Sequence, residues 1–252
     1  MQNAMTELTL TNPWLTALLV NGALGLVAWL LPKKLLTPQG YLHAGILGIG
    51  LWGTLGWRGY VVILAYFVFG SAVTRLGFAQ KERLGIAEGR SGLRGPENVW
   101  GSAATALACG LLTLICPESW LPLLTLGYVA SLSAKLADTT ASEVGKAYGQ
   151  RTFLITTLKP VPRGTEGAVS LEGTLAGLGG GLVLALTGWA AGLITPWGVV
   201  LAASAAFVAN TLESLIGAAL QTRWSWLTNE LVNGVNTALG AAVAIGLAQL
   251  GR

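Results

Sequence analysis

Residues 194–220 read ITPWGVVLAASAAFVANTLESLIGAAL, a run of 27 residues in which Glu213 is the only charged side chain. As a helix rising 1.5 Å per residue, this run would be about 40 Å long. That length exceeds the ~30 Å hydrocarbon layer of a bilayer, so the run is predicted to cross a membrane. Together with similar runs it predicts an all-α fold, a polytopic transmembrane helix bundle of about eight spans. The runs are Trp14–Leu31, Leu42–Trp57, Gly59–Thr74, Val99–Cys116, Ser119–Leu136, Ala168–Ala190, Ile194–Leu220 and Leu231–Leu250.

The composition of the whole chain indicates the same class of protein. Hydrophobic residues make up 53% and charged residues 10% of the 252 residues, with a mean hydropathy of +0.62. Ordinary soluble domains carry about 25% charged residues, so this composition excludes a water-soluble globular enzyme. It is also too apolar for a disordered chain. One His and two Cys exclude a structural zinc site and a His-centred triad. Any chemistry must use carboxylates, Lys and Arg, hydroxyls and backbone groups.

The positive charges divide unequally between alternate loops. Of the 15 Lys and Arg residues, 13 lie in one set of loops and two, Arg58 and Arg252, lie in the other. Because cytoplasmic loops carry the excess of Lys and Arg, we expect both termini outside. The loops at about 75–98 and 135–167 would then face the cytoplasm. Membrane orientation also accounts for the pI near 9.3, so no nucleic acid is predicted as a partner.

Polar side chains recur at helical spacing near the ends of four predicted spans. Each set lies on one helix face and at the end predicted to face the cytoplasm. A single stripe of this kind also arises from hydrogen bonds between neighbouring helices. Because polar groups within a span are costly, four stripes at one depth favour a shared polar cavity. The sets are Arg94, Asn98, Gly101 and Thr105; Ser131, Lys135, Asp138 and Ser142; Asn210, Glu213, Gly217 and Gln221; and Asn229, Asn233 and Asn236.

Two segments after the fifth predicted span carry groups suited to phosphates. Residues 136–146 place Asp138 and Glu143 beside hydroxyls and a lysine, and oxygen ligands suit Mg²⁺ that bridges substrate phosphates. The two carboxylates lie about 140° apart on a continuous helix. They meet at one ion only if the helix breaks, or else they act on different ions. Residues 159–174, KPVPRGTEGAVSLEGT, form a basic, glycine-rich entry to a helix N-terminus, which favours phosphate.

Four motifs occur in order and are together more specific than any one of them. They are GSAVTRLG (70–77), DTTASEVG (138–145), GTEGAVSLEGT (164–174) and ESLIGA (213–218). On these residues the chain resembles, over about residues 20–250, the integral-membrane family that includes phytyl-phosphate kinase of tocopherol and phylloquinone synthesis. That family is a distant relative of the CTP-dependent polyprenol and phytol kinases. Glu213 stands where the family often has Asp, and Glu166-Gly167 where it often has two glycines.

We expect one membrane-embedded catalytic domain over residues 1–252, and the resemblance implies its activity. It would transfer a phosphoryl group from a nucleoside triphosphate, with CTP favoured, to an isoprenyl monophosphate, with Mg²⁺ as cofactor. Acceptor chain length, the nucleotide and the oligomeric state stay open. The expected metal ligands are Asp138, Glu143 and Glu213, with Asp138, Lys135 and Glu143 as catalytic residues. The expected nucleotide- and phosphate-binding residues are Arg75, Lys81, Arg94, Asn98, Ser142, Lys159, Arg163, Gly164, Thr165, Gly167, Ser170, Gly173, Thr174, Asn210 and Asn233.

Three other functions remain open on the sequence. A lipid cytidylyltransferase would use similar carboxylates but release pyrophosphate. A phytol or polyprenol kinase would phosphorylate the free alcohol and would need a base, for which Asp138 is the candidate. A transporter would carry its polar residues near the midplane, so stripes at one membrane face favour an enzyme.

Overall fold

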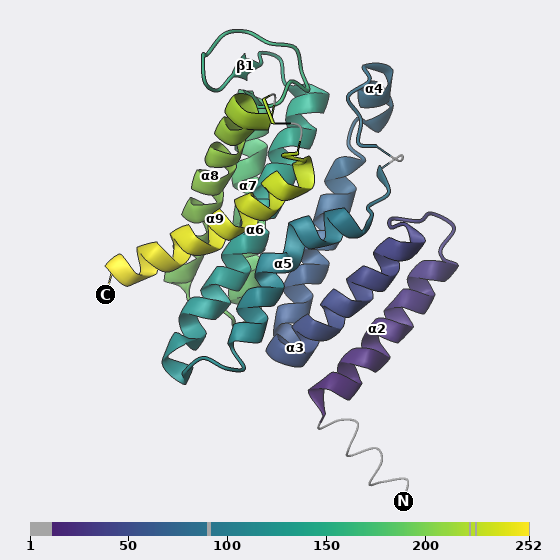
Figure 1. Cartoon of the computed structure of the whole chain (residues 1–252), viewed down its shortest axis with the longest axis vertical. Helices are drawn as coiled ribbons and strands as arrows, with labels where there is room; N and C mark the ends of the chain where they lie inside the picture. Colours follow the sequence, from purple (N-terminus) through teal and green to yellow (C-terminus); the bar gives the residue numbers. More distant parts are fainter. Residues whose placement is uncertain (1–11, 90–91, 222, 225, 252) are drawn as a thin grey trace, which may run out of the picture.

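The structure is a computed structural model that describes residues 12–89, 92–221, 223–224 and 226–251. Arg252 and the residues before Asn12, on which the predicted position of the termini depends, lie outside these ranges. The described chain forms helices and one short antiparallel strand pair (Figure 1). The helices are α2 (Pro13–Leu30), α3 (Pro38–Thr74), α4 (Phe78–Arg83), α5 (Pro96–Leu112), α6 (Leu121–Tyr148), α7 (Leu171–Ala190), α8 (Pro196–Ile216) and α9 (Asn229–Leu250), with a 3₁₀ turn at Glu118–Trp120 and a π-helical turn at Gly217–Gln221; the strands are β1 (Phe153–Leu154) and β2 (Ala168–Val169).

Hydroxyl side chains fix where several helices begin. The side chains of Thr37, Ser170 and Thr195 each accept a hydrogen bond from the backbone N–H three residues further on, at 3.0, 3.1 and 3.1 Å. Such caps satisfy donors that have no partner inside the helix. Pro38 and Pro196 follow two of these caps, where a residue without an N–H loses nothing. Because these starts are set by local sequence, the observed helices begin within a few residues of the predicted runs.

Helix α3 contains both the second and the third predicted runs, which are separated only by Arg58. Gly56 lies inside it with φ 63° and ψ −161°, a conformation that side-chain-bearing residues rarely adopt. In a straight helix Gly40 and Gly70 would lie about 45 Å apart. Instead, Gly40 lies against the backbone carbonyl of Arg94 and Gly70 against its guanidinium. The chain therefore doubles back at Gly56, and α3 has two arms, residues 38–55 and 57–74 (Figure 1).

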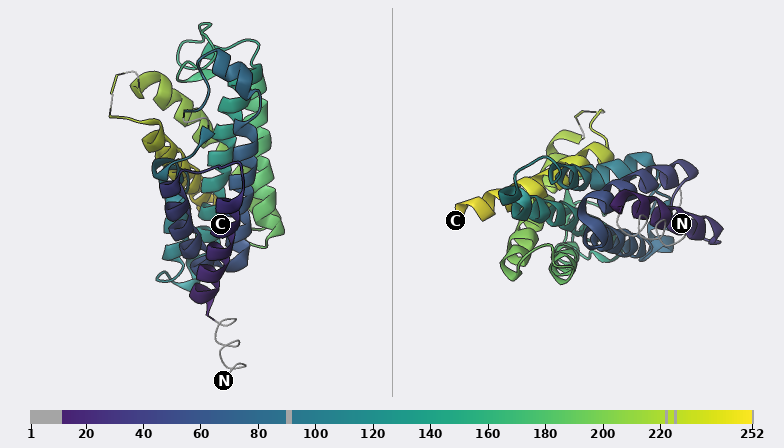
Figure 2. Two further views of the ribbon diagram at one scale, coloured as in Figure 1. Left: turned by 90° about the vertical axis from the view of Figure 1, so that its right-hand side faces the viewer. Right: turned by 90° about the horizontal axis from the view of Figure 1, so that it is seen from below.

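Helix α6 forms the centre of the bundle. It packs against α3, α5, α7, α8 and α9, and Tyr128, Val129 and Leu132 are fully buried. Helix α2 contrasts with it, because α2 packs mainly on α3 and leaves most of its side chains exposed. Figure 2 shows α2 and the C-terminal end of α9 at opposite edges of the molecule. A membrane bundle of this kind presents a packed interior and an apolar outer surface to lipid.

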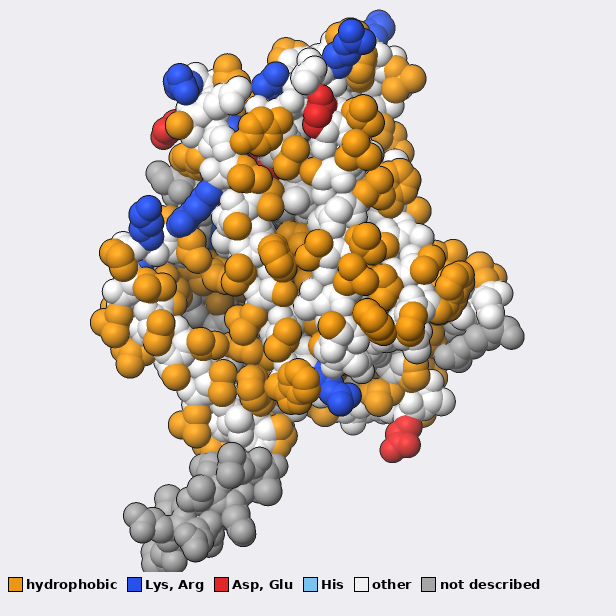
Figure 3. Space-filling model, turned by 180° about the vertical axis from the view of Figure 1, so that it is seen from behind, with side chains coloured by type: hydrophobic (Ala, Val, Ile, Leu, Met, Phe, Trp, Pro, Cys, Tyr) orange, Lys and Arg blue, Asp and Glu red, His pale blue; other side chains and the backbone are white. Residues whose placement is uncertain are grey.

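The helices confirm the predicted all-α, multi-pass membrane fold. Six helices in the described chain are long and apolar enough to cross a membrane. Counting the arms of α3 separately and adding the 17-residue α5 matches the eight predicted runs. Hydrophobic side chains cover the middle of the surface in Figure 3, and Lys and Arg side chains gather toward the end that carries α4 and the strand pair.

One predicted boundary is wrong. Residues 135–148 were expected to open the second cytoplasmic loop, but α6 continues through them to Tyr148. Several polar side chains there are buried. Lys135, Asp138, Thr139 and Glu143 are all buried against neighbouring elements. The connecting segment between α6 and α7 is therefore shorter, residues 149–170, and contains the strand pair.

Candidate functional site

A polar cavity of about 220 Å³ opens at the end of the bundle that carries the two basic loops. Members of all four predicted polar stripes line it, so the predicted shared cavity is present. The remaining stripe residues lie outside its lining. Thr105, for example, bonds to Thr237 at 2.9 Å, and Asn236 donates to the Ala134 carbonyl at 3.3 Å. The stripe residues that line the cavity are Arg94, Asn98, Lys135, Asp138, Ser142, Asn210, Glu213, Asn229 and Asn233.

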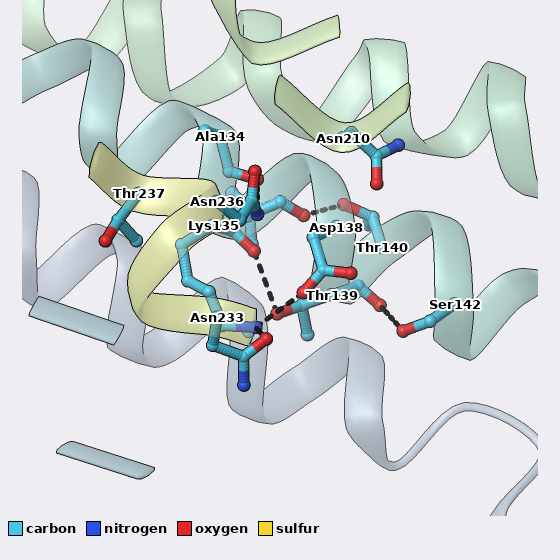
Figure 4. A network of polar contacts seen from close by, with 12 residues as sticks. Ala134, Lys135, Asp138, Thr139, Thr140, Ser142, Asn210, Asn233, Asn236 and Thr237 are labelled. Atoms are coloured by element: carbon cyan, nitrogen blue, oxygen red, sulfur yellow. Dashed lines mark hydrogen bonds and ion pairs between the residues drawn. The ribbon is translucent and has the colours of Figure 1, made fainter. Parts of the chain in front are cut away.

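Lys135 and Asp138 form the buried charged centre of this cavity. The Lys135 ammonium donates to Asp138 Oδ2 at 2.5 Å and to Asn233 Oδ1 at 2.8 Å (Figure 4). The pair lies three residues apart on α6, and only 8% and 11% of the two side chains are exposed. Because Asn233 belongs to α9, the ammonium also joins two helices. The Lys135 ammonium is buried and paired, as a buried charge must be, and it borders an open cavity. It is therefore placed to interact with a charged ligand in that cavity.

Glu143 faces a different partner from Asp138. Since α6 is a continuous helix through both residues, their side chains leave it in different directions. Glu143 forms a buried ion pair with Lys81 of α4, and Lys81 also donates to the Thr74 carbonyl at 2.8 Å. Lys81 is fully buried and does not line the cavity. This pair fastens the first basic loop to α6.

The three carboxylates predicted as metal ligands do not gather into one cluster. Among the described residues, no group of three or more His, Cys, Asp and Glu side chains is placed to hold a metal ion. Asp138, Glu143 and Glu213 nevertheless all line the cavity. Glu213 on α8 lines it together with Asp138 and Lys135 of α6. The cavity thus holds acidic groups from two helices facing the Lys135 ammonium.

The glycine-rich segment lies over the cavity beside the start of α7. Gly164, Thr165, Gly167, Ser170, Gly173 and Thr174, predicted to bind phosphate, all line it. Gly167 has a φ of 73° and lies against the Ser214 carbonyl, so the segment is fastened next to Glu213. Ser170 caps α7, and Gly173 and Thr174 in the first turn of α7 line the cavity. Such an arrangement suits an anion.

Four of the predicted phosphate-binding cations do not line the cavity: Arg75, Lys81, Lys159 and Arg163. Arg75 ends α3, and Lys159 is exposed. Arg163 donates to the Ala147 carbonyl at 3.3 Å, which ties its loop to the end of α6. Their charge and their position in the sequence predicted a place in the cavity, but Lys81 and Arg163 make other contacts. Arg75 and Lys159 are exposed.

Arg94 is the predicted cation that the structure does bring into the cavity. Its guanidinium donates to the Tyr66 hydroxyl at 3.3 Å and to Thr74 Oγ1 at 3.4 Å, and it lies over the Tyr66 ring. Both partners are neutral, and within the described chain Arg94 has no carboxylate partner. A guanidinium held by neutral groups keeps its full charge for an anionic ligand.

Other residues that line the cavity were not predicted from the sequence. Tyr66 and Thr74 belong to α3, and Lys146 belongs to α6. Lys146 continues the stripe of Asp138 and Ser142 at the same four-residue spacing, so that pattern contains the signal for it. Glu88 and Glu230 also line the cavity, but nothing in their sequence surroundings indicates it.

Fold and cavity together define a multi-pass membrane protein with a polar, mixed-charge site at one end of its helices. The family described as integral membrane protein DUF92 matches residues 21–241, and the chain belongs to it. This confirms the resemblance to the integral-membrane family that includes phytyl-phosphate kinase. No solved structure matches the chain significantly.

Three relatives illustrate the spread of the similarity. An uncharacterized membrane protein of Synechocystis sp. is 63% identical, covering 95% of this chain and 93% of its own. Protein VTE6, chloroplastic, of Arabidopsis thaliana is 42% identical over 99% of this chain and 76% of its own. An uncharacterized membrane protein of Methanocaldococcus jannaschii is 30% identical over 84% of this chain and 86% of its own. In each case the matched region covers most of the bundle.

Proposed function

We propose that this protein is a membrane kinase that transfers a phosphoryl group from a nucleoside triphosphate to an isoprenyl monophosphate, giving the diphosphate. The observation that carries the proposal is the cavity itself, which gathers Arg94, Lys135 and Lys146 with Asp138 and Glu213 beside the N-terminus of α7. Membership of the family and the 42% identity to Protein VTE6 support the same class of reaction. CTP is the favoured donor because the family is a distant relative of CTP-dependent kinases.

The reaction requires no covalent bond between the protein and the transferred phosphoryl group. An oxygen of the acceptor monophosphate bonds to the γ-phosphorus while the bond from that phosphorus to the β–γ bridging oxygen breaks. The products are the lipid diphosphate and a nucleoside diphosphate. Catalysis of this step depends mainly on positioning and on stabilising negative charge. The Lys135 ammonium and the Arg94 guanidinium are the groups that would do so, and the glycine-rich segment and the start of α7 would hold phosphates.

The carboxylates of the cavity suit Mg²⁺, but the set of ligands we propose differs from the one expected from the sequence. This ion commonly uses one or two carboxylates together with substrate phosphates. Asp138 and Glu213 are the carboxylates we propose as its ligands, whereas the ion pair with Lys81 gives Glu143 a structural role. When bound, the ion would neutralise charge on the nucleotide phosphates. Asp138 would then interact with both the ion and the Lys135 ammonium. Lys135 would keep its hydrogen bond to Asn233.

The cavity is proposed to face the cytoplasm. Nucleoside triphosphates are supplied there, and 13 of the 15 Lys and Arg residues lie in the loops assigned to that side. A lipid monophosphate in the membrane would present its headgroup at the same depth as the polar helix ends.

The test is product analysis by mass spectrometry with purified protein, an isoprenyl monophosphate and each of the four nucleoside triphosphates. The proposal expects an isoprenyl diphosphate and a nucleoside diphosphate. A nucleotide–lipid with released pyrophosphate would indicate a cytidylyltransferase instead. Phosphorylation of the free isoprenyl alcohol but not of its monophosphate would indicate an alcohol kinase. Either result contradicts the proposal.

A further inference from the structure

An apolar groove of about 360 Å³ lies between α2, both arms of α3 and the start of α5. Leu24, Ala28, Leu47 and Ile63 are typical of its walls. Its walls along α2 extend from Asn21 to Leu31, which is about 15 Å of helix. Near Asn21 the Tyr60 hydroxyl donates to the Asn21 side chain at 2.8 Å, so polar groups mark this end.

The groove and the polar cavity meet. Four residues line both of them: Tyr66, Arg94, Asn98 and Ser102. The Arg94 guanidinium therefore stands where apolar walls give way to polar ones, with only neutral hydrogen-bond partners in the described chain. An anionic head on an apolar chain matches this junction in both charge and polarity.

We propose that the groove holds the hydrocarbon chain of the lipid monophosphate, with its phosphate at Arg94 facing the polar cavity. The identity of this lipid as the phosphoryl acceptor rests on the function proposed above. Helix α2 forms one wall of the groove, packs mainly on α3 and lies at the edge of the bundle (Figure 2), so a lipid can enter the groove from the side.

The physical chemistry of such a site predicts what it selects. A chain that moves from bilayer lipid into an apolar groove leaves one apolar medium for another, so the hydrophobic effect contributes little. The groove then discriminates by shape and by the position it gives the phosphate. One methylene that does not fit an apolar pocket changes specificity by about 10-fold or more. Narrowing the groove should therefore act on long acceptors and spare short ones.

Two glycines of α2 provide a matched pair of variants. A Cβ at either Gly22 or Gly25 would meet no atom within 4 Å, so a side chain can start from both positions without a clash at its Cβ. Gly25 lines the groove, whereas Gly22 is exposed and does not. Gly45, on the first arm of α3, also lines the groove and has open space around it. Gly25→Leu and Gly45→Leu narrow the groove from two sides, and Gly22→Leu is the control.

The first measurement is photo-crosslinking with an isoprenyl monophosphate that carries a diazirine at the end of its chain, without nucleotide. Crosslinks should map to α2 and the first arm of α3. Gly25→Leu and Gly45→Leu should each lower their yield about 10-fold, whereas Gly22→Leu should keep it. Crosslinks elsewhere, equal yields in all variants, or equal displacement by phosphatidylglycerol and by unlabelled isoprenyl monophosphate would overturn the inference.

The second measurement separates this inference from the proposed function. Turnover is followed with a long-chain isoprenyl monophosphate and with isopentenyl monophosphate. In Gly25→Leu the kcat/KM for the long acceptor should fall about 10-fold while that for the short one is unchanged. Equal losses with both acceptors would refute a chain-binding groove. If wild-type protein crosslinks in the groove but forms no diphosphate, the kinase proposal fails and the lipid site stands.

Discussion

Replacing Asp138 by Asn tests the charged centre of the cavity most sharply. The Asp138 carboxylate accepts from the Lys135 ammonium at 2.5 Å, and both residues are largely buried on α6. Asn keeps the size and an acceptor for Lys135 but removes the negative charge. If Asp138 binds Mg²⁺ on the nucleotide phosphates, its charge acts directly on the reacting groups. We expect turnover to fall by about two decades or more, which corresponds to ~2.7 kcal/mol of barrier.

A purely structural role for Asp138 makes a different prediction. The neutral side chain leaves the Lys135 ammonium buried with Asn233 and an amide as its partners, and an uncompensated buried charge costs about 3–5 kcal/mol of stability. Lys135→Ala added to Asp138→Asn removes that charge. If Asp138 and Lys135 only balance each other and neither acts on the reacting phosphates, the double variant should recover both thermal stability and turnover. If it binds the metal, stability should recover and turnover should not.

The assay is turnover against Mg²⁺ concentration for wild type, both single variants and the double variant, with the Tm of each measured in the same detergent. A shift of the Mg²⁺ dependence in Asp138→Asn is the expected signature. Unchanged Mg²⁺ dependence together with recovered turnover in the double variant would refute the metal role of Asp138.

Three further predictions follow from the contacts. Lys81→Met should lower the free energy of unfolding by about 3–5 kcal/mol, because it leaves Glu143 buried and unpaired. Glu143→Leu in the same chain should restore most of this stability, and unchanged unfolding of Lys81→Met in detergent would contradict the pairing. Arg94→Ala should raise the KM for the lipid monophosphate by about 10- to 100-fold, the worth of a hydrogen bond to a charged group, whereas Arg163→Ala, outside the cavity lining, should leave it unchanged; equal effects would refute the assignment. In a background without Cys109 and Cys116, a cysteine at Glu88 should react with a membrane-impermeant reagent only from the cytoplasmic side and one at Glu118 only from the other side; the reverse would invert the proposed orientation.

Much of the fold could be predicted because a membrane-spanning helix is recognised from the length and hydropathy of a single stretch of sequence. Length and hydropathy marked the apolar runs, and the single residue between two of them, Arg58, lies two residues from the turn observed at Gly56. Helical spacing was sufficient to predict that residues of four helices would line one cavity, since each stripe has a single face and a shared depth. The end of α6 could not be predicted, because the polar residues after Leu136 indicated an exposed loop. In the structure Asp138 and Glu143 are buried within the helix bundle.

The contacts of individual side chains depend on distant parts of the chain. Lys81 and Glu143 are 62 residues apart, and no local pattern indicates that they pair. Arg163 and Lys159 were expected in the cavity from their charge and position, but the loop conformation directs them elsewhere. The apolar groove could not be foreseen either, because its walls come from α2, α3 and α5 and read as ordinary membrane-spanning sequence.

The most direct test of phosphoryl transfer in this cavity follows the label of a nucleoside triphosphate carrying ³²P at either the α- or the γ-position. Wild-type protein with an isoprenyl monophosphate should move the γ-label, and never the α-label, into the lipid diphosphate. Asp138→Asn should retain at most about 1% of that transfer. Transfer of the α-label into lipid, or full γ-label transfer by Asp138→Asn, would contradict phosphoryl transfer at Asp138 in this cavity.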